Sequence, residues 1–168
     1  MAQLVLTLVG DDRAGLVRSL ADAVATHGGN WERSELAELA GAFAGIVLVS
    51  VPDDSLAALT EELKSLDGLL HITPHASRGA AAPEGEKLSF TVLGNDHPGI
   101  VRDITRALVD HGLSIDRFTS RTLEAPMSGG TLFEATVSAH IPSGVDAAEA
   151  TGALERIAGE IQVDLTVG

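Results

Sequence analysis

The sequence predicts an α+β protein built from two copies of one unit, each with the order strand, helix, strand, strand, helix, strand. The first observation is an internal repeat: residues 10–33 align with residues 94–117 at a constant offset of 84, and nine aligned positions are identical. The second is the apolar pattern, which alternates between strand-like runs and helical stripes in both halves. Because two such copies account for nearly all 168 residues, we expect two domains.

The first half of copy one reads as a strand followed by a helix. Residues 3–9 form a short apolar run typical of a buried strand, and a turn follows at residues 10–15. The helix after the turn is expected to end at His27 and Gly28, because glycine readily adopts the left-handed conformation that ends helices. Its buried face is predicted to carry Leu16, Leu20, Ala23 and Val24.

The second half of copy one reads as a hairpin, a helix and a last strand. Residues 30–39 and 43–51 predict two antiparallel strands joined by a tight turn at residues 40–42. Residues 69–74 are predicted to be the fourth strand. Between them we expect a helix that is capped by Ser55 and buries Leu56, Leu59, Leu63 and Leu66.

Copy two repeats this order. Its first helix carries apolar residues at the positions equivalent to those of copy one, namely Ile100, Ile104, Ala107 and Leu108. Pro52 and Pro142 match at an offset of 90, so six residues are inserted between the middle strands, most simply within residues 124–130. The predicted elements are a strand at 87–93, a helix at 99–111, strands at 114–123 and 131–141, a helix at 146–159 and a strand at 161–167.

This order predicts a ferredoxin-like fold in each copy, which is a four-stranded antiparallel sheet with two helices on one face. We expect domain one at residues 1–75, a linker at residues 76–86 and domain two at residues 87–168; the linker segment is small, polar and without periodicity. The second strand of each copy lies at a sheet edge with unpaired backbone groups. Edge-to-edge pairing of the copies and stacking of their faces both remain open.

Composition excludes several classes of function. A formal charge of -13 would repel a phosphate backbone, and four Phe and one Trp offer few aromatic rings for stacking on bases, so direct nucleic-acid binding is not expected. The absence of cysteine excludes disulfides and thiolate nucleophiles. The apolar run at residues 4–9 is too short for a signal peptide or a membrane span, so we expect a cytoplasmic protein.

The repeated motif Gly-[Asp/Asn]-Asp-x-[Ala/Pro]-Gly between the first strand and the first helix is the candidate binding element. Glycines allow a sharp turn and close approach of a ligand, and the helix start offers free N–H groups suited to a carboxylate. A purely structural interpretation is that Asp12 and Asp96 cap the helices. Arg18 and Arg102 either neutralise these aspartates or reach a ligand, and the ion pair is favoured.

Two segments carry a resemblance to a known family. His97-Pro98-Gly99 followed by Ile100, and the His-Gly-x-[Asn/Ser]-[Trp/Ile] stretches at residues 27–31 and 111–115, resemble the ACT domain, a regulatory module that binds small molecules. Two such domains without a catalytic partner, together with the segments at residues 10–16 and 39–47, resemble the glycine cleavage system transcriptional repressor family.

The resemblance implies that the first loop of an ACT domain meets the carboxylate of an amino acid, and that the start of an adjacent domain's second strand completes the pocket. Ala14 replaces a usual proline and Ser114 replaces a usual asparagine, so edge-to-edge pairing would give one intact site and one degenerate site. The intact site would comprise Asn95, Asp96, His97, Pro98, Gly99 and Ile100 with Asn30. The degenerate site would comprise Asp11, Asp12, Arg13, Ala14, Gly15 and Leu16 with Ser114.

We therefore expect a non-catalytic regulatory protein that senses an amino acid such as glycine or serine and acts through a protein partner in transcription. No cofactor or metal is expected, since His71 and His75 lack an accompanying acidic cluster. An enzyme is less favoured, because no set of nucleophile and base and no phosphate-binding glycine motif is evident. An assembly module with decayed pockets is the alternative that Ala14 and Ser114 support, and exposed strand edges would suit a homodimer.

Overall fold

The computed structural model describes residues 1–77, 86–125, 129–141, 143–144 and 147–167. The chain divides into two compact units, Met1–Ala80 and Ala81–Gly168. Most of the predicted linker at residues 76–86 and the centre of the predicted insertion at residues 124–130 lie outside the described residues. The boundaries given to the two domains from sequence therefore stay predictions.

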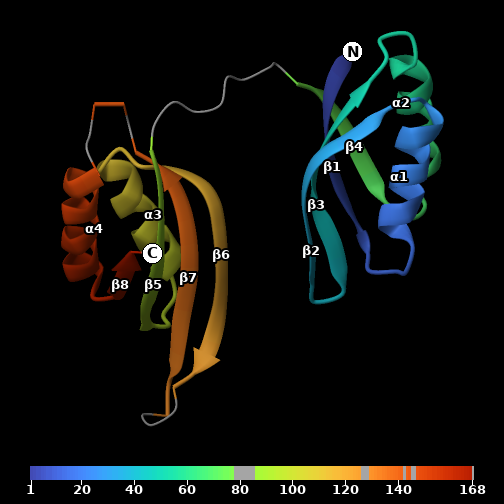
Figure 1. Cartoon of the computed structure of the whole chain (residues 1–168). Coiled ribbons are helices and arrows are strands. Elements are labelled where there is room, and N and C mark those ends of the chain that lie inside the picture. Colours follow the sequence, from blue (N-terminus) through green and yellow to red (C-terminus); the bar gives the residue numbers. More distant parts are fainter. Residues whose placement is uncertain (78–85, 126–128, 142, 145–146, 168) are drawn as a thin grey trace. The chain divides into compact units, whose positions relative to one another are not determined.

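The first unit has the predicted order of elements. They are β1 (Ala2–Asp11), α1 (Leu16–Thr26), β2 (Asn30–Leu39), β3 (Ala42–Val51), α2 (Leu56–Ser65) and β4 (His71–Ala76). The strands pair antiparallel in the order β2-β3-β1-β4, with both helices on one face of the sheet (Figure 1). The predicted ferredoxin-like fold and the edge position of the second strand are confirmed.

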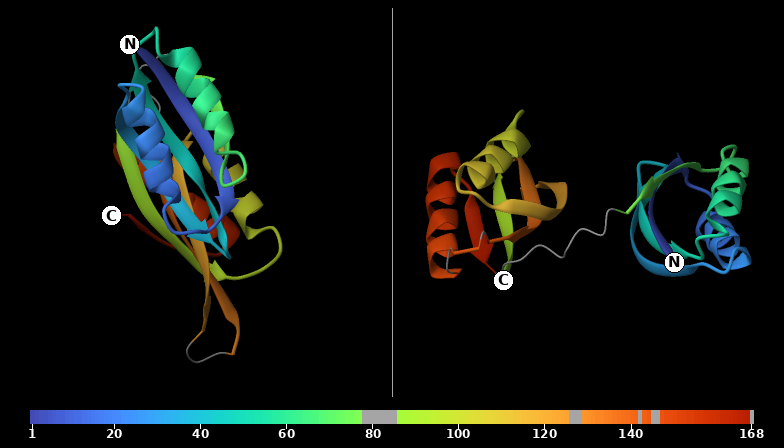
Figure 2. Two further views of the ribbon diagram at one scale, coloured as in Figure 1. Left: turned by 90° about the vertical axis from the view of Figure 1, so that its right-hand side faces the viewer. Right: turned by 90° about the horizontal axis from the view of Figure 1, so that it is seen from above.

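The second unit repeats this architecture. Its elements are β5 (Lys87–Asn95), α3 (Ile100–Asp110), β6 (Ser114–Glu124), β7 (Thr131–His140), α4 (Ala147–Ile161) and β8 (Asp164–Val167). The sheet order is β6-β7-β5-β8, again antiparallel, and the views of Figure 2 show α3 and α4 on the same side of it.

A separate apolar core fills the space between sheet and helices in each unit. Alternate residues of the central strands point inward, and the predicted inward faces of α1 and α3 are buried as expected. Leu56 and Leu66 of the predicted α2 stripe are only partly buried. Representative core residues are Leu6, Leu20, Val47 and Leu59 in the first unit and Phe90, Ile104, Val137 and Leu154 in the second.

Three local predictions need correction. Ser55 precedes α2 but makes no capping hydrogen bond, because its backbone is already helical rather than extended. β4 begins at His71 instead of residue 69, because Leu69 and Leu70 still donate their N–H groups to the carbonyl of Leu66. Helix α4 continues through Gly159 and ends before Gln162, whose φ of +57° breaks the helix, so β8 starts at Asp164 rather than residue 161.

Candidate functional site

The first predicted loop joins β1 to α1 and lies on the surface. Asp11 ends β1, and Asp12 donates its backbone N–H to the carbonyl of Gly41 over 2.9 Å. Gly15 then adopts φ +93°, a conformation that side chains oppose. Residues 11–15 are exposed, whereas Leu16 is 5% exposed and anchors the loop to the core.

The second predicted loop has the same geometry between β5 and α3. Asp96 donates its N–H to the carbonyl of Thr131 over 2.9 Å, and Gly99 has φ +94°. Residues 95–99 are exposed, and Ile100 is 5% exposed. The duplicated motif therefore forms the same surface loop twice.

Each loop presents the open start of a helix. The first N–H groups that bond back to the start of their helix are those of Ser19 and Asp103. They donate to the carbonyls of Gly15 and Gly99 over 2.9 and 3.0 Å, respectively. Of the N–H groups just before them, that of Ile100 donates to the carbonyl of His97 over 3.2 Å. The others have no acceptor within the helix and carry partial positive charge, which favours a bound carboxylate. The interpretation of Asp12 and Asp96 as helix caps is wrong, because a glycine three residues later occupies each N-cap position.

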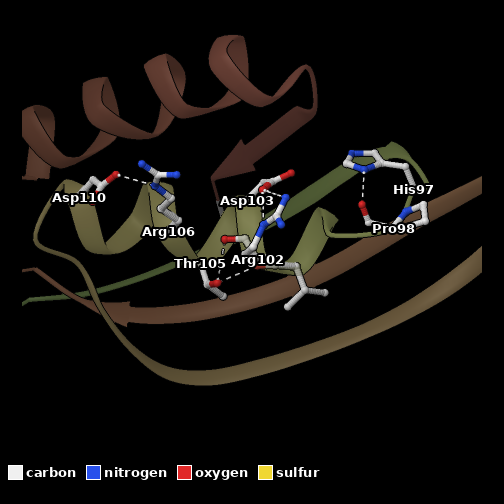
Figure 3. A network of polar contacts seen from close by, with 8 residues as sticks. His97, Pro98, Arg102, Asp103, Thr105, Arg106 and Asp110 are labelled. Carbon is white, nitrogen blue, oxygen red and sulfur yellow. Dashed lines mark hydrogen bonds and ion pairs between the residues drawn. The ribbon is translucent and has the colours of Figure 1, made fainter.

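The repeated arginines form ion pairs, but with partners other than the loop aspartates. Arg18 Nε lies 3.6 Å from Asp22 Oδ2, one turn further along α1. Arg102 Nη2 lies 3.0 Å from Asp103 Oδ1. The same Nη2 atom would lie 3.0 Å from a Cβ placed on Gly99. The guanidinium of Arg102 therefore borders the second loop. Figure 3 shows its ion pair with Asp103.

The predicted strand residues lie far from the loops of their own unit. Asn30 is the first residue of β2 and pairs with Ser50, which in turn pairs with Gln3 near the start of β1. Asp11 lies eight residues further along β1, which corresponds to about 27 Å. A single domain of this fold therefore does not bring its loop and its second strand into one pocket.

The second unit has the same separation. Ser114 begins β6 and pairs with His140, which pairs with Lys87 at the start of β5, whereas Asn95 ends that strand. Asn30 and Ser114 are both exposed, and each is followed by a β-bulge. The local setting of the two strand residues is therefore similar despite the change of side chain.

Surface cavities adjoin both loops. In the first unit a cavity of about 360 Å³ is lined by four of the predicted loop residues and by Val17, Arg18 and Phe43. In the second unit a cavity of about 500 Å³ includes His97 and Ile100 of the predicted loop. Its other lining residues are Ala107, which the sequence places on the buried face of the helix, and four that sequence reasoning did not single out, namely Asp103, Arg106, Asp110 and Gln162.

A polar contact between the buried His140 and the exposed Asp116, beside Ser114, was also missed. His140 is 8% exposed, and its Nδ1 contacts the Oδ2 atom of Asp116 at the bulge of β6. The equivalent position in the first unit, at the offset of 90 that follows the insertion, is Ser50. The sequence signal that could have revealed this contact is a histidine in copy two where copy one has a serine.

The described residues give no support to a metal site or a membrane segment. Within them, no group of three or more His, Cys, Asp or Glu side chains is arranged to hold a metal ion. His71 Nδ1 instead contacts Asp67 Oδ1 at 2.8 Å, and His75 Nε2 lies 3.3 Å from Thr7 Oγ1. Across the same part of the chain, no helix has the length and apolar character needed to cross a membrane.

Comparison with known families matches residues 2–73 to the ACT domain and residues 89–159 to the ACT domain again. The chain belongs to the ACT domain family. Its two ACT domains stand in tandem, as the sequence predicts, and together they cover most of the chain.

Relatives that match most of this ACT-domain chain include regulators of transcription. The glycine cleavage system transcriptional repressors of Escherichia coli (strain K12) and Shigella flexneri are each 28% identical to it over 162 residues, covering 94% of this chain and 85% of the repressor. A crystal structure of an unknown protein from Galdieria sulphuraria is 30% identical, with a TM-score of 0.84 over 99% of this chain and 96% of that chain. The family and the repressors together point to a regulatory protein.

Proposed function

We propose that this protein is a non-catalytic regulator that senses a small amino acid, such as glycine or serine, and controls amino-acid metabolism through a protein partner. The observation that carries the proposal is the duplicated exposed loop, in which a left-handed glycine leads into an open helix start. Such a start suits the carboxylate of an amino acid. Regulation follows if the ligand binds one arrangement of the protein more tightly than another.

The binding pocket is proposed to combine the loop of one ACT domain with the strand start of another. Within the first domain, Asp11 lies about 27 Å along β1 from the level of Asn30. This distance supports a pocket that takes its loop and its strand start from different domains. The principal site comprises residues 95–100 with Asn30, whose amide supplies both a donor and an acceptor. The second site comprises residues 11–16 with Ser114 and is weaker, because Ala14 and Ser114 depart from the family pattern.

Titration calorimetry of the whole chain with glycine and then serine tests this proposal. Saturable binding that falls about ten-fold in Asn30→Ala and much less in Ser114→Ala is the expected result. Both side chains are exposed at the start of an edge strand, so neither substitution should disturb the core and the two are matched controls for each other. Equal losses in the two variants would refute the assignment of the principal site.

The regulated partner is proposed to be a protein rather than DNA. A formal charge of -13 opposes approach to a phosphate backbone, so any effect on transcription would pass through a DNA-binding protein. The purified chain should therefore leave duplex DNA unretarded in a gel at physiological salt. Specific retardation under those conditions would contradict the proposed route.

The alternative function is an assembly module whose pockets have decayed. Ala14 and Ser114 favour it, because each removes one feature of the family's binding pattern. In that case neither glycine nor serine would bind at millimolar concentration, and the chain would still self-associate or capture its partner. Ligand binding that alters this association would instead support the sensor.

A further inference from the structure

The sheet of the first domain has an apolar outer face, which is the face turned away from α1 and α2 (Figure 1). Side chains alternate along its central strands, so Leu6 and Val47 enter the core while their neighbours in the strand point outward. Val9 and Ile46 are each 49% exposed there, although both belong to central strands. We define the outer face by its six central positions, namely Val5, Thr7, Val9, Ala44, Ile46 and Leu48.

The sheet of the second domain is an internal control for this face. Its equivalent positions pair in the same register on β5 and β7, and five of the six are polar. They are Ser89, Thr91, Leu93, Glu134, Thr136 and Ser138. The second domain thus folds with polar groups where the first has Val5, Ala44, Ile46 and Leu48. An apolar face that the fold itself does not require is typical of a surface that another molecule covers.

We propose that the outer face joins two copies of this chain, with the sheet of one first domain packed against the sheet of the other. Two sheets pack stably when their facing sides are apolar, with aligned strands and a spacing of about 10 Å. A second copy supplies the same apolar face. The outer face of a second domain would instead bring Glu134, Thr136 and Ser138 out of water, which costs desolvation. The six positions are distinct from the residues of the proposed pocket, so either proposal can fail without the other.

The charges beside the outer face select the symmetry of this dimer. Arg33 and Glu35 point outward from β2 at one side of the face, and two histidines of β4 point outward at the other. A two-fold axis parallel to the strands lays β2 of each copy over β4 of its partner, so Glu35 lies opposite the partner's Thr73. The partner's His71 and His75 are two residues to either side of that position. An axis across the strands, through the middle of the face, would instead set Glu35 against the partner's Glu35, and like charges oppose that arrangement.

The size of the face suits a reversible dimer. The stretch of β1 from Gln3 to Asp11 spans about 27 Å, and the four strands span about 19 Å. Two such faces together bury on the order of 1,000 Å², which is near the lower limit for a specific interface. Each copy also carries a formal charge of -13, so the copies repel one another. We therefore expect dissociation in the micromolar range and a tighter dimer when salt screens this repulsion.

Sedimentation equilibrium of the whole chain, from micromolar to millimolar concentration, tests the dimer. The expected result is a monomer–dimer equilibrium that shifts toward the dimer between about 0.1 M and 1 M salt. A chain that stays monomeric at millimolar concentration would overturn the proposal. A dimer that dissociates as the salt concentration rises would overturn it as well, because ion pairs rather than apolar contact would then hold the two copies together.

Two variants locate the interface on the outer face. Ile46→Thr and Leu48→Ser give the first sheet the side chains that the second sheet already carries, so both variants should fold, which Trp31 fluorescence checks. Each change occurs twice in a dimer and removes apolar contact, so each should weaken association at least about ten-fold. Val109→Thr is the matched control, because Val109 is 67% exposed on α3 of the second domain. Association that is unchanged in Ile46→Thr and Leu48→Ser, or equally weakened in Val109→Thr, would refute the interface.

Cross-linking tests the direction of the two-fold axis. The chain contains no cysteine, so a single introduced thiol reports on one position. When Ala37→Cys on β2 and Thr73→Cys on β4 are mixed, a short bis-maleimide should join one variant to the other, and neither variant should link efficiently to itself. Efficient self-linking of Ala37→Cys would place β2 over the partner's β2 and contradict the proposed axis.

Discussion

Gly15 and Gly99 begin helices α1 and α3 with the same left-handed backbone, φ +93° and +94°. In each loop an aspartate three residues earlier donates its N–H to a carbonyl at the central hairpin over 2.9 Å. The duplication thus retained the backbone of the loop. The side chains around it diverged, with Arg13 in one copy and His97 in the other.

Replacement of either loop glycine should destabilise its own domain. Gly15→Ala and Gly99→Ala each place a side chain at positive φ, which costs about 1–2 kcal/mol. A Cβ at position 15 meets no atom within 4 Å, so its cost is purely conformational, whereas one at position 99 also displaces the Arg102 guanidinium. Amide hydrogen exchange, which resolves the two domains, measures both losses.

A helical glycine is the matched control for that experiment. Gly152→Ala lies within α4, and its Cβ would make only an ordinary contact of 3.6 Å with Arg156 Nη1. This change should stabilise the second domain by about 0.5–1 kcal/mol, because alanine loses less backbone freedom than glycine. A loss of stability at position 152 comparable to that at position 99 would argue against strain as the cause.

Gly45 is required by the close approach of β2 and β3. A Cβ there would lie 2.1 Å from the carbonyl oxygen of Glu35, so Gly45→Ala should cost about 3 kcal/mol or more. Trp31, the one tryptophan of the chain, packs against the core of the first domain and reports its unfolding in denaturant. Gly68→Ala has open space at its Cβ and should leave the transition within about 0.5 kcal/mol.

His27 links α1 to α2 through Glu62, with Nε2 and Oε2 2.5 Å apart and side-chain exposures of 18% and 39%. Glu62→Gln removes the charge from this partly buried hydrogen bond and should lower the stability of the first domain by about 1 kcal/mol. Trp31 fluorescence in a urea titration measures the change. Glu61→Gln, which affects only the exposed pair with Lys64, should be nearly neutral, and an equal effect would contradict the linking role of His27.

Asp116 supports the buried His140 in the second domain. Asp116→Ala leaves the imidazole without this partner in a site with little access to water, so the second domain should lose about 1–3 kcal/mol. Hydrogen exchange should show lower protection across β6 and β7, while the Trp31 transition of the first domain stays unchanged. A change in both the hydrogen exchange of β6 and β7 and the Trp31 transition of the first domain would show that the two domains unfold together.

Much of the fold follows from local patterns. The buried faces of α1 and α3 agree with their helical periodicity, and the edge position of β2 follows from the order of elements. The ends of elements were less predictable. Gly159 looks like a helix end but remains inside α4, because Gln162 takes the left-handed position instead.

By itself the sequence determined the duplication, the order of elements, the inward faces of the helices and the glycine loops, because each depends on residues near one another in the chain. Only the tertiary structure decided which charges meet across elements, such as His140 with Asp116, and that Asn30 lies at the far end of the sheet from Asp11. The register between antiparallel strands sets these relationships, and no local pattern encodes it.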